Sequence, residues 1–174
     1  LYLTSSFTFE DAEQGRAIFA EEQAGNIYSR YMNPNVDEFV SKMCVLENAE
    51  DGIAFSTGMA AIFASMAGLL KSGDHIVASS SLYGGTYNLL SVTLPRLGIT
   101  TTFVDPSDPA NFEAAITEKT KAVFIESLGN PGINVIDIQA VADIAHSHGI
   151  PLIIDNTFGT PYLIRPIEHG ADVV

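Results

Sequence analysis

From residue 37 to residue 155 the sequence alternates between stretches with helical spacing of apolar residues and short apolar runs. The predicted helices are 37–48, 59–70, 84–96, 109–117 and 138–148, and the predicted strands are 53–55, 75–79, 100–104, 121–126 and 151–155. This order, with short turns between the elements, is typical of βαβ units, in which consecutive strands lie parallel and helices cover the sheet. The expected fold class is therefore α/β, with a mainly parallel sheet flanked by helices.

The stretch at 138–148 illustrates the helical pattern. Ile138, Val141 and Ala145 recur at a spacing that places them on one face of a helix. Asp137 is suited to cap the start of this helix and Gly149 to end it. The strand predicted after it leads directly to Asp155.

An uncharged run, residues 52–70, raises the question of a membrane span, which needs about 20 apolar residues. Ser56, Thr57 and Gly58 divide this run into a short strand and a helix of about three turns. We therefore expect two buried elements in this region and no contact with a membrane.

Residues 1–36 do not follow the alternation. Turn signals at Gly25-Asn26 and Asn33-Pro34, with the acidic stretch 10–22, predict an extended arm with a short helix, suited to reaching across a subunit boundary. The sequence starts without methionine, and residues 172–174 resemble the opening of another strand. Since domains seldom stop within a strand, we expect the natural chain to continue at both ends.

The charge balance excludes nucleic acid as a partner. Only 8 Lys and Arg stand against 21 Asp and Glu, for a net charge of −13, and phosphate backbones are bound through basic patches. The single cysteine, Cys44, cannot form an internal disulfide, so a reducing cytoplasm is expected. Hydrophobic residues form 47% of the chain, so part of this apolar surface is expected to face further chain or other subunits.

Several common cofactor sites are also excluded. The four histidines show no metal-ligand spacing with Cys or acids, so no metal site is expected. Neither a Gly-x-Gly-x-x-Gly pattern nor a Gly-Lys-Ser/Thr motif occurs, which excludes the usual nicotinamide and P-loop nucleotide sites.

Asp155 comes directly after the apolar run 150–154, so it stands at the end of a predicted buried strand. Ligands of open α/β sheets bind beyond the carboxyl ends of the strands, where a carboxylate is well placed for chemistry. A turn cap is the ordinary alternative for an acid at this place.

Two further segments are suited to binding phosphate. Gly58 and Met59 begin a predicted helix, whose free N–H groups and dipole favour an anion. Tyr28 and Arg30, two residues apart, offer a hydroxyl and a planar guanidinium. The alternatives are a simple helix cap at Gly58, a core residue at Met59 and a solvated surface pair at Tyr28 and Arg30.

Five segments resemble, in the same order, those of the pyridoxal-phosphate (PLP) enzymes of cysteine and methionine metabolism, the trans-sulfuration family. They are residues 28–34 (YSRYMNP), 56–61 (STGMAA), 83–87 (YGGTY), 126–131 (ESLGNP) and 155–158 (DNTF). The resemblance covers nearly the whole chain and implies the large domain of a type I PLP-dependent transferase, the aspartate aminotransferase-like fold, in incomplete form. It implies an N-terminal arm at 1–36 that reaches a neighbouring subunit and a PLP-binding large domain at 37–174.

The same resemblance implies how the cofactor is bound. Gly58 and Met59 correspond to the phosphate cup of the family, with Ser56 and Thr57 as additional candidates. Tyr28 and Arg30 correspond to residues that reach the phosphate of a neighbouring subunit's cofactor. The implied assembly is a homodimer or homotetramer with shared active sites.

Four residues are implied to contact the cofactor ring or support it. Tyr83 corresponds to a residue that stacks on the ring and assists proton transfer, Asn130 to one that binds the ring oxygen, and Asp155 to the partner of the ring nitrogen. Thr157 corresponds to a supporting hydroxyl, and Glu126 is expected to support the loop that carries Asn130. Ordinary packing for Tyr83 and turn hydrogen bonds for Asn130 and Thr157 are the alternatives.

The family's Schiff-base lysine lies in a His-Ser-x-Thr-Lys segment that follows the match to residues 170–174, so it is expected beyond Val174. The four lysines present lie in polar or helix-terminal settings and are unsuited to this role: Lys42, Lys71, Lys119 and Lys121. The fragment alone is therefore expected to be inactive. A non-catalytic fragment or scaffold is the alternative from another functional class.

Residues 83–90, 92–99 and 126–131 are most similar to O-acetylhomoserine sulfhydrylases, which replace the γ-acetoxy group with sulfur to give homocysteine. Met59 departs from this pattern, because many sulfhydrylases carry Gln there, whereas the lyases and cystathionine γ-synthases carry Met. Gly85 disfavours methionine γ-lyase, which tends to carry Cys in this region. We expect γ-replacement on O-acetylhomoserine in the complete enzyme, with cystathionine γ-synthase, γ-lyase and methionine γ-lyase as alternatives.

Overall fold

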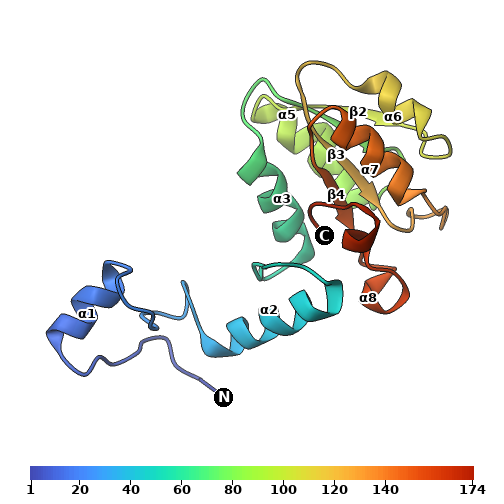
Figure 1. Cartoon of the computed structure of the whole chain (residues 1–174). Coiled ribbons are helices and arrows are strands. Elements are labelled where there is room, and N and C mark those ends of the chain that lie inside the picture. The colour runs from blue at the N-terminus through green and yellow to red at the C-terminus, as the bar shows by residue number, and fades with distance from the viewer. The chain divides into compact units, whose positions relative to one another are not determined.

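The computed structural model describes all 174 residues and divides into two compact units. The first unit comprises Leu1–Val45 and Ala49–Ala54, and the second comprises Leu46–Asn48 and Phe55–Val174. The elements in chain order are shown in Figure 1 and described below unit by unit.

The first unit contains α1 (Ala12–Phe19) and most of α2 (Pro34–Glu47). Asp11 caps α1, since its side chain accepts a hydrogen bond from the Gln14 N–H at 2.8 Å. Pro34 opens α2, where its missing N–H costs nothing. The short helix expected in the N-terminal arm is present as α1.

The second unit is built on a four-stranded parallel sheet of β1 (His75–Ser79), β2 (Thr100–Val104), β3 (Thr120–Glu126) and β4 (Leu152–Asp155). The strand order is β2-β1-β3-β4, and all three pairings are parallel. Two of the predicted strands agree with the structure at both ends, and two agree to within one residue. The expected α/β fold class is confirmed.

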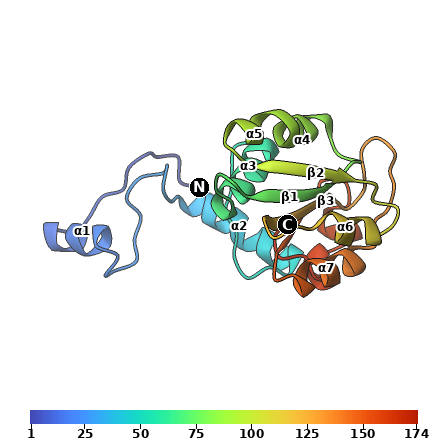
Figure 2. The same ribbon diagram turned by 90° about the horizontal axis from the view of Figure 1, so that it is seen from above.

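Helices cover both faces of the sheet (Figure 2). On one face lie α3 (Gly58–Leu69) and a continuous helical segment of α4 (Gly84–Asn88), η1 (Leu89–Thr93) and α5 (Leu94–Arg96). On the other face lie α6 (Ala110–Ala115) and α7 (Ile138–Ser147). Two short elements, α8 (Thr160–Leu163) and the 3₁₀ helix η2 (Pro166–His169), follow β4.

The core consists of two apolar clusters, one on each face of the sheet. Successive side chains of a strand point to opposite faces, and β1 shows this alternation. Val77 belongs to the cluster with Phe112 of α6, whereas Ile76 and Ala78 belong to the cluster with Met66 of α3. All five of these side chains are fully buried, so the apolar runs that predicted the strands also build the core.

The helical segment from Gly84 to Arg96 was expected as one helix, and its middle, η1, is a π-helix. The Leu94 N–H donates to the Leu89 carbonyl, five residues back. Pro95 explains this local widening, because it has no N–H and its ring would collide with the carbonyl of Ser91 in a regular α-helix.

The strand predicted at 53–55 is wrong. Residues 51–55 have no regular structure, and the side chains of Ile53 and Phe55 are exposed. A short apolar run becomes a strand only when a neighbouring strand pairs with it, and no strand of the chain does so here.

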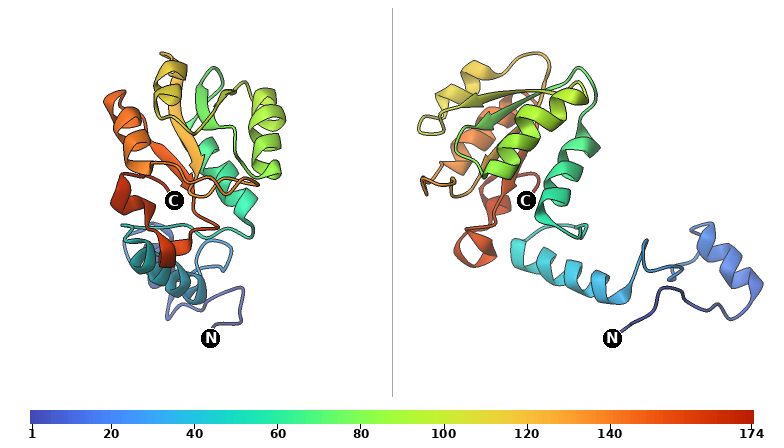
Figure 3. Two further views of the ribbon diagram at one scale, coloured as in Figure 1. Left: turned by 90° about the vertical axis from the view of Figure 1, so that its right-hand side faces the viewer. Right: turned by 180° about the vertical axis from the view of Figure 1, so that it is seen from behind.

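The C-terminal residues, dark red in Figure 3, return to the sheet. Val173 forms a parallel bridge with Ile153, and the Ile154 N–H donates to the Val173 carbonyl at 2.8 Å. This pairing is what the strand-like sequence at 172–174 predicted.

No helix in the chain combines the length and the apolar character that crossing a bilayer requires.

Candidate active site

The carboxyl ends of β1, β3 and β4 form one edge of the sheet, because these three strands are parallel neighbours. The chain leaves β1 toward Tyr83, β3 ends at Glu126 and β4 ends at Asp155. Glu126 and Asp155 are direct partners in the β3–β4 register. The sheet therefore gathers, at one edge, polar and aromatic residues that are distant in the sequence.

Asp155 uses one oxygen for the local turn and leaves the other free. Its Oδ1 accepts hydrogen bonds from the Thr157 N–H at 2.9 Å and from the Thr157 hydroxyl, whereas Oδ2 accepts none. Asp155 is partly exposed. The turn-cap and ligand-binding interpretations are therefore compatible, since the free oxygen remains available to a cationic partner.

A buried polar network lies directly behind Asp155. The Ser127 hydroxyl donates to Asn156 Oδ1 at 2.8 Å, and Asn156 Nδ2 donates to the Ile164 carbonyl at 3.0 Å. The Ser127 N–H also donates to the Asp155 carbonyl at 3.0 Å. Sequence reasoning assigned no role to Ser127 or Asn156, although each directly follows a strand-end acid.

Glu126 forms a hydrogen bond with Tyr83, the residue that precedes α4. Its Oε1 accepts a hydrogen bond from the backbone N–H of Tyr83 at 2.7 Å, and its side chain is buried. Burial raises the pKa of Glu126, the negative charge of Asp155 raises that pKa further, and the Tyr83 N–H opposes the shift. The side chain thus supports the segment that carries Tyr83, and not the Asn130 loop as the sequence suggested.

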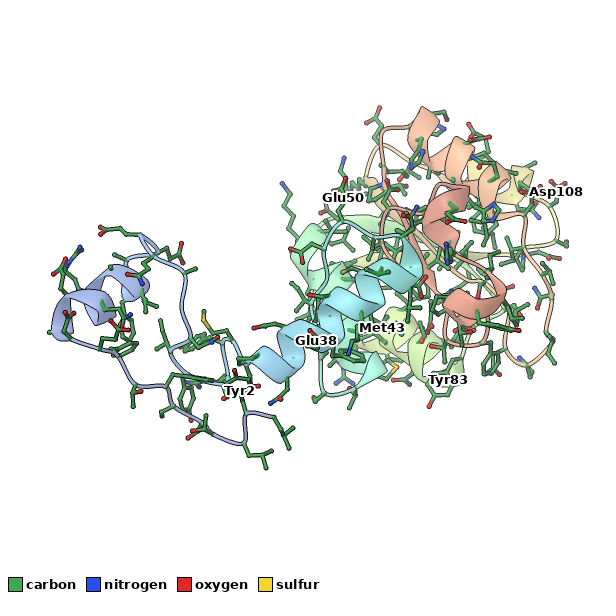
Figure 4. All side chains as sticks on the ribbon, turned by 60° about the horizontal axis from the view of Figure 1, so that its bottom comes forward. Tyr2, Glu38, Met43, Glu50, Tyr83 and Asp108 are labelled. Carbon is green, nitrogen blue, oxygen red and sulfur yellow. The ribbon has the colours of Figure 1, made fainter.

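Tyr83 is half exposed, at 52%, and its side chain is labelled in Figure 4. A Cβ atom at Gly85 would lie 2.5 Å from Cε1 of this ring. Only glycine leaves room for the ring in this position, so Gly85 helps to set the direction in which Tyr83 points.

The start of α3 presents free N–H groups next to α4. Thr57 caps the helix by accepting from the Ala60 N–H at 3.1 Å, and the N–H groups of Gly58 and Met59 have no acceptor. No atom lies within 4 Å of a Cβ built on Gly58, so the approach is open. The Thr86 hydroxyl lies 3.9 Å from the Met59 sulfur, which places this helix start beside the first turn of α4.

The loop that carries Asn130 is held at both ends. The Gly129 N–H donates to the Asn134 carbonyl at 3.0 Å, and the Ile133 N–H donates to the Gly129 carbonyl at 2.7 Å. The Ser81 hydroxyl, just after β1, donates to Asn134 Oδ1 at 2.6 Å. The Asn130 side chain makes no hydrogen bond of its own and remains available.

Tyr28 and Arg30 belong to the first unit. The Arg30 guanidinium lies 5.5 Å from the centroid of the Tyr28 ring and 5.3 Å from that of Tyr31, within cation–π range. A turn brings Tyr28 and Arg30 together, since the N–H groups of Tyr31 and Met32 both donate to the Tyr28 carbonyl. Arg30 forms no ion pair, so its guanidinium group is free to bind an anion.

A sequence model of the family described as Cys/Met metabolism PLP-dependent enzyme matches residues 1–174, the entire chain. The chain belongs to this family. The resemblance inferred from the five segments is thereby confirmed.

Similar proteins carry the names homocysteine synthase and O-acetyl-L-homoserine sulfhydrylase. Homocysteine synthase of Schizosaccharomyces pombe is 51% identical over all of this chain and 41% of its own length. O-acetyl-L-homoserine sulfhydrylase of Leptospira meyeri is 46% identical over all of this chain and 39% of its own length. This chain thus spans about two fifths of the relatives that it matches.

A solved structure shows the same fold. The crystal structure of a protein assigned as an O-acetylhomoserine (thiol)-lyase from Campylobacter jejuni superimposes with a TM-score of 0.93 at 40% identity, covering 98% of this chain and 42% of that protein. That structure contains a pyridoxyl-lysine phosphate. The type I architecture expected of this family is confirmed.

The residues of the second unit fit PLP by the chemistry of their donors and acceptors. Free N–H groups suit a phosphate, a free carboxylate oxygen suits a protonated ring nitrogen, and an exposed aromatic ring suits stacking on a pyridine ring. No group of His, Cys, Asp and Glu is arranged to bind a metal ion.

Proposed function

We propose that this chain is part of a PLP enzyme that replaces the γ-substituent of O-acetylhomoserine with a sulfur nucleophile. The gathering of Gly58, Met59, Tyr83 and Asp155 around one sheet edge is the observation that supports this proposal. The names of the Leptospira meyeri and Campylobacter jejuni proteins support O-acetylhomoserine as the substrate. We also propose that residues 1–36 form an arm to a neighbouring subunit, that residues 37–174 belong to the PLP-binding domain, and that the enzyme is cytoplasmic.

The phosphate of PLP would be held by the N–H groups of Gly58 and Met59 at the start of α3. These groups have no acceptor within the chain, and the helix dipole adds positive potential. In a shared site, Arg30 of a second copy would add its planar fork and Tyr28 its hydroxyl. Local donors are required here because the net charge of −13 disfavours an anion.

Asp155 would keep the pyridine nitrogen protonated. When bound, the protonated pyridine ring supplies an electron sink for the cleavage of bonds at the amino-acid substrate. The free Oδ2 of Asp155 provides the opposite charge, and its Oδ1 bonds to Thr157 fix the orientation of the carboxylate.

Tyr83 would cover the exposed face of the ring and move a proton during departure of the γ-substituent. Asn130, whose side chain has no other partner, would donate to the ring oxygen. Gly85 supports γ-replacement over methionine γ-lyase activity, because a cysteine there would collide with the present position of the Tyr83 ring.

The lysine that carries the cofactor would lie outside residues 1–174. Lys42 pairs with Glu38 on α2, whereas Lys119 and Lys121 lie at the amino end of β3, opposite to the site. Lys71 follows α3, at the end away from Gly58.

Absorbance titration of bound PLP tests the role of Asp155. Asp155→Asn should lower the pKa of the ring nitrogen by about 1–3 units, the usual effect of losing a nearby opposite charge. Asp143→Asn is the matched control, because Asp143 is exposed on α7 and bonds only to Gln139. An Asp155→Asn titration equal to that of the unaltered protein would contradict the assignment.

The complete natural protein tests the reaction itself. Borohydride reduction should add one phosphopyridoxyl group to the intact mass, and O-acetylhomoserine with sulfide should give homocysteine. If the protein forms a ketoacid from methionine and forms no homocysteine from O-acetylhomoserine, the result would favour a γ-lyase.

Mixing two inactive variants tests the shared site. Arg30→Ala and Asp155→Asn affect different subunits of one site, so mixed dimers should contain one intact site and recover part of the activity. A mixture no more active than either variant alone would refute the shared arrangement.

A further inference from the structure

Glu126 occupies a central place at the candidate site without a role in the proposed chemistry. It is the last residue of β3, which lies between β1 and β4. Its side chain is 5% exposed. A buried acid at a strand end, flanked by the segments that lead to Tyr83 and contain Asp155, requires a physical explanation because burying a carboxyl group is costly.

The contacts of Glu126 point to Tyr83. The Tyr83 N–H donates to Glu126 Oε1 at 2.7 Å, at the first residue before α4. Tyr83 has no side-chain cap of its own, so this bond is the side-chain contact that fixes the entry into the helix. With Gly85 leaving room for the ring, a fixed Tyr83 backbone restricts where the ring can lie.

The second neighbour of Glu126 is Asp155, its partner in the β3–β4 register. The groups that face Glu126 are the N–H of Tyr83 from the α4 side and the carboxylate of Asp155 from β4, and no Lys, Arg or His is paired with it. Burial and Asp155 both raise the pKa of Glu126. The carboxyl group therefore keeps its proton to a higher pH than an ordinary glutamate does.

We propose that Glu126 is a positioning residue, which fixes Tyr83 at the sheet edge through the Oε1···N hydrogen bond and couples this segment to Asp155. The inference rests on the proposed function in so far as Tyr83 and Asp155 act on PLP. Ionisation of Glu126 places a second negative charge beside Asp155 and so alters the field at the ring nitrogen.

Two variants separate the hydrogen bond from the charge. Glu126→Gln keeps the size and an acceptor oxygen but cannot ionise, whereas Glu126→Ala removes the acceptor. Glu118→Gln is the matched control, because Glu118 is exposed in the loop before β3. Urea unfolding of each variant shows whether the fold is retained.

Amide hydrogen exchange gives a readout that needs no cofactor. The Tyr83 amide should exchange at least about tenfold faster in Glu126→Ala, as expected for the loss of a bond to a buried acid, and within about twofold of the unaltered rate in Glu126→Gln. Equal Tyr83 exchange in the unaltered chain and in Glu126→Ala refutes the positioning role, and so does fast exchange in Glu126→Gln.

The absorbance of bound PLP tests the coupling to Asp155. The pH titration of the unaltered protein should contain an inflection from Glu126 that Glu126→Gln lacks and Glu118→Gln retains. Identical titrations of the unaltered protein and Glu126→Gln refute the coupling. Failure of the complete natural protein to bind PLP refutes the proposed function, while Tyr83 exchange still decides whether Glu126 positions Tyr83.

Discussion

Gly129→Ala should destabilise the loop that carries Asn130. A Cβ atom at this position would lie 2.4 Å from Asn134 Oδ1 and 2.5 Å from Ser81 Oγ. Both atoms end side chains, so they can move aside, but moving them breaks their own 2.6 Å hydrogen bond. The backbone at Gly129 lies outside the left-handed region, so the cost is steric and not conformational.

The magnitude follows from two contributions. Overpacking a tight site costs about 1–3 kcal/mol, and a lost hydrogen bond costs about 0.5–1.5 kcal/mol. We expect Gly129→Ala to lower the free energy of unfolding by about 2–4 kcal/mol in urea titrations. Gly68→Ala is the control, because a Cβ there meets no atom within 4 Å, and alanine in a helix interior is favoured over glycine by up to about 1 kcal/mol.

A double-mutant cycle tests the cause. Asn134→Ala removes the atom nearest the new methyl group, so Gly129→Ala should cost at least about 1 kcal/mol less in that background than in the unaltered protein. Additive free energies would refute the steric reasoning, because the two substitutions would then act independently. A Gly129→Ala protein as stable as the unaltered one would refute it as well.

Three further substitutions give expected changes in the free energy of unfolding. Asp137→Ala removes the bond to the Ala140 N–H at the start of α7 and should cost about 1 kcal/mol, whereas Asp137→Asn should cost little. Met66→Ala empties a fully buried position and should cost about 2–5 kcal/mol, against less than about 1 kcal/mol for the half-exposed Leu69→Ala; equal costs would contradict the assigned core. Burial lowers the pKa of His75 below 6.5, so the folded chain binds this proton less readily than the unfolded chain. The stability that depends on neutral His75 is therefore complete above about pH 6.5 and is lost as the pH falls below that value. Between about pH 7.5 and 5.5, the urea midpoint of His75→Gln should fall less than the midpoint of the unaltered protein.

The strands and the strand-end residues could be predicted from the sequence because their information is local. The segments 75–79 and 100–104 are short, contain apolar or β-branched residues, are bounded by turn residues and follow predicted helices. Parallel topology then places Asp155 and Tyr83 at a common edge without further information.

The hydrogen bonds that hold the site could not be predicted in this way. The bond from Ser81 to Asn134 joins residues 53 positions apart, and that from Tyr83 to Glu126 spans 43 positions. Such pairs depend on strand register and loop path, which no local pattern specifies. The failed strand at 53–55 has the same origin, since pairing with a neighbour and not apolar character alone decides whether a strand forms.

The π-helical turn of η1 fixes the rotational phase of the helical segment that begins next to Tyr83. Each residue added to or removed from a helix rotates one end against the other by about 100°. With η1 in place, Leu89, Leu90 and Leu94 are all buried against the sheet, while the first turn still brings Thr86 to Met59. Pro95, twelve positions after Tyr83, thus helps to determine the direction that the first turn of α4 faces. Deletion of a single residue within 89–93 would rotate this first turn away from the start of α3.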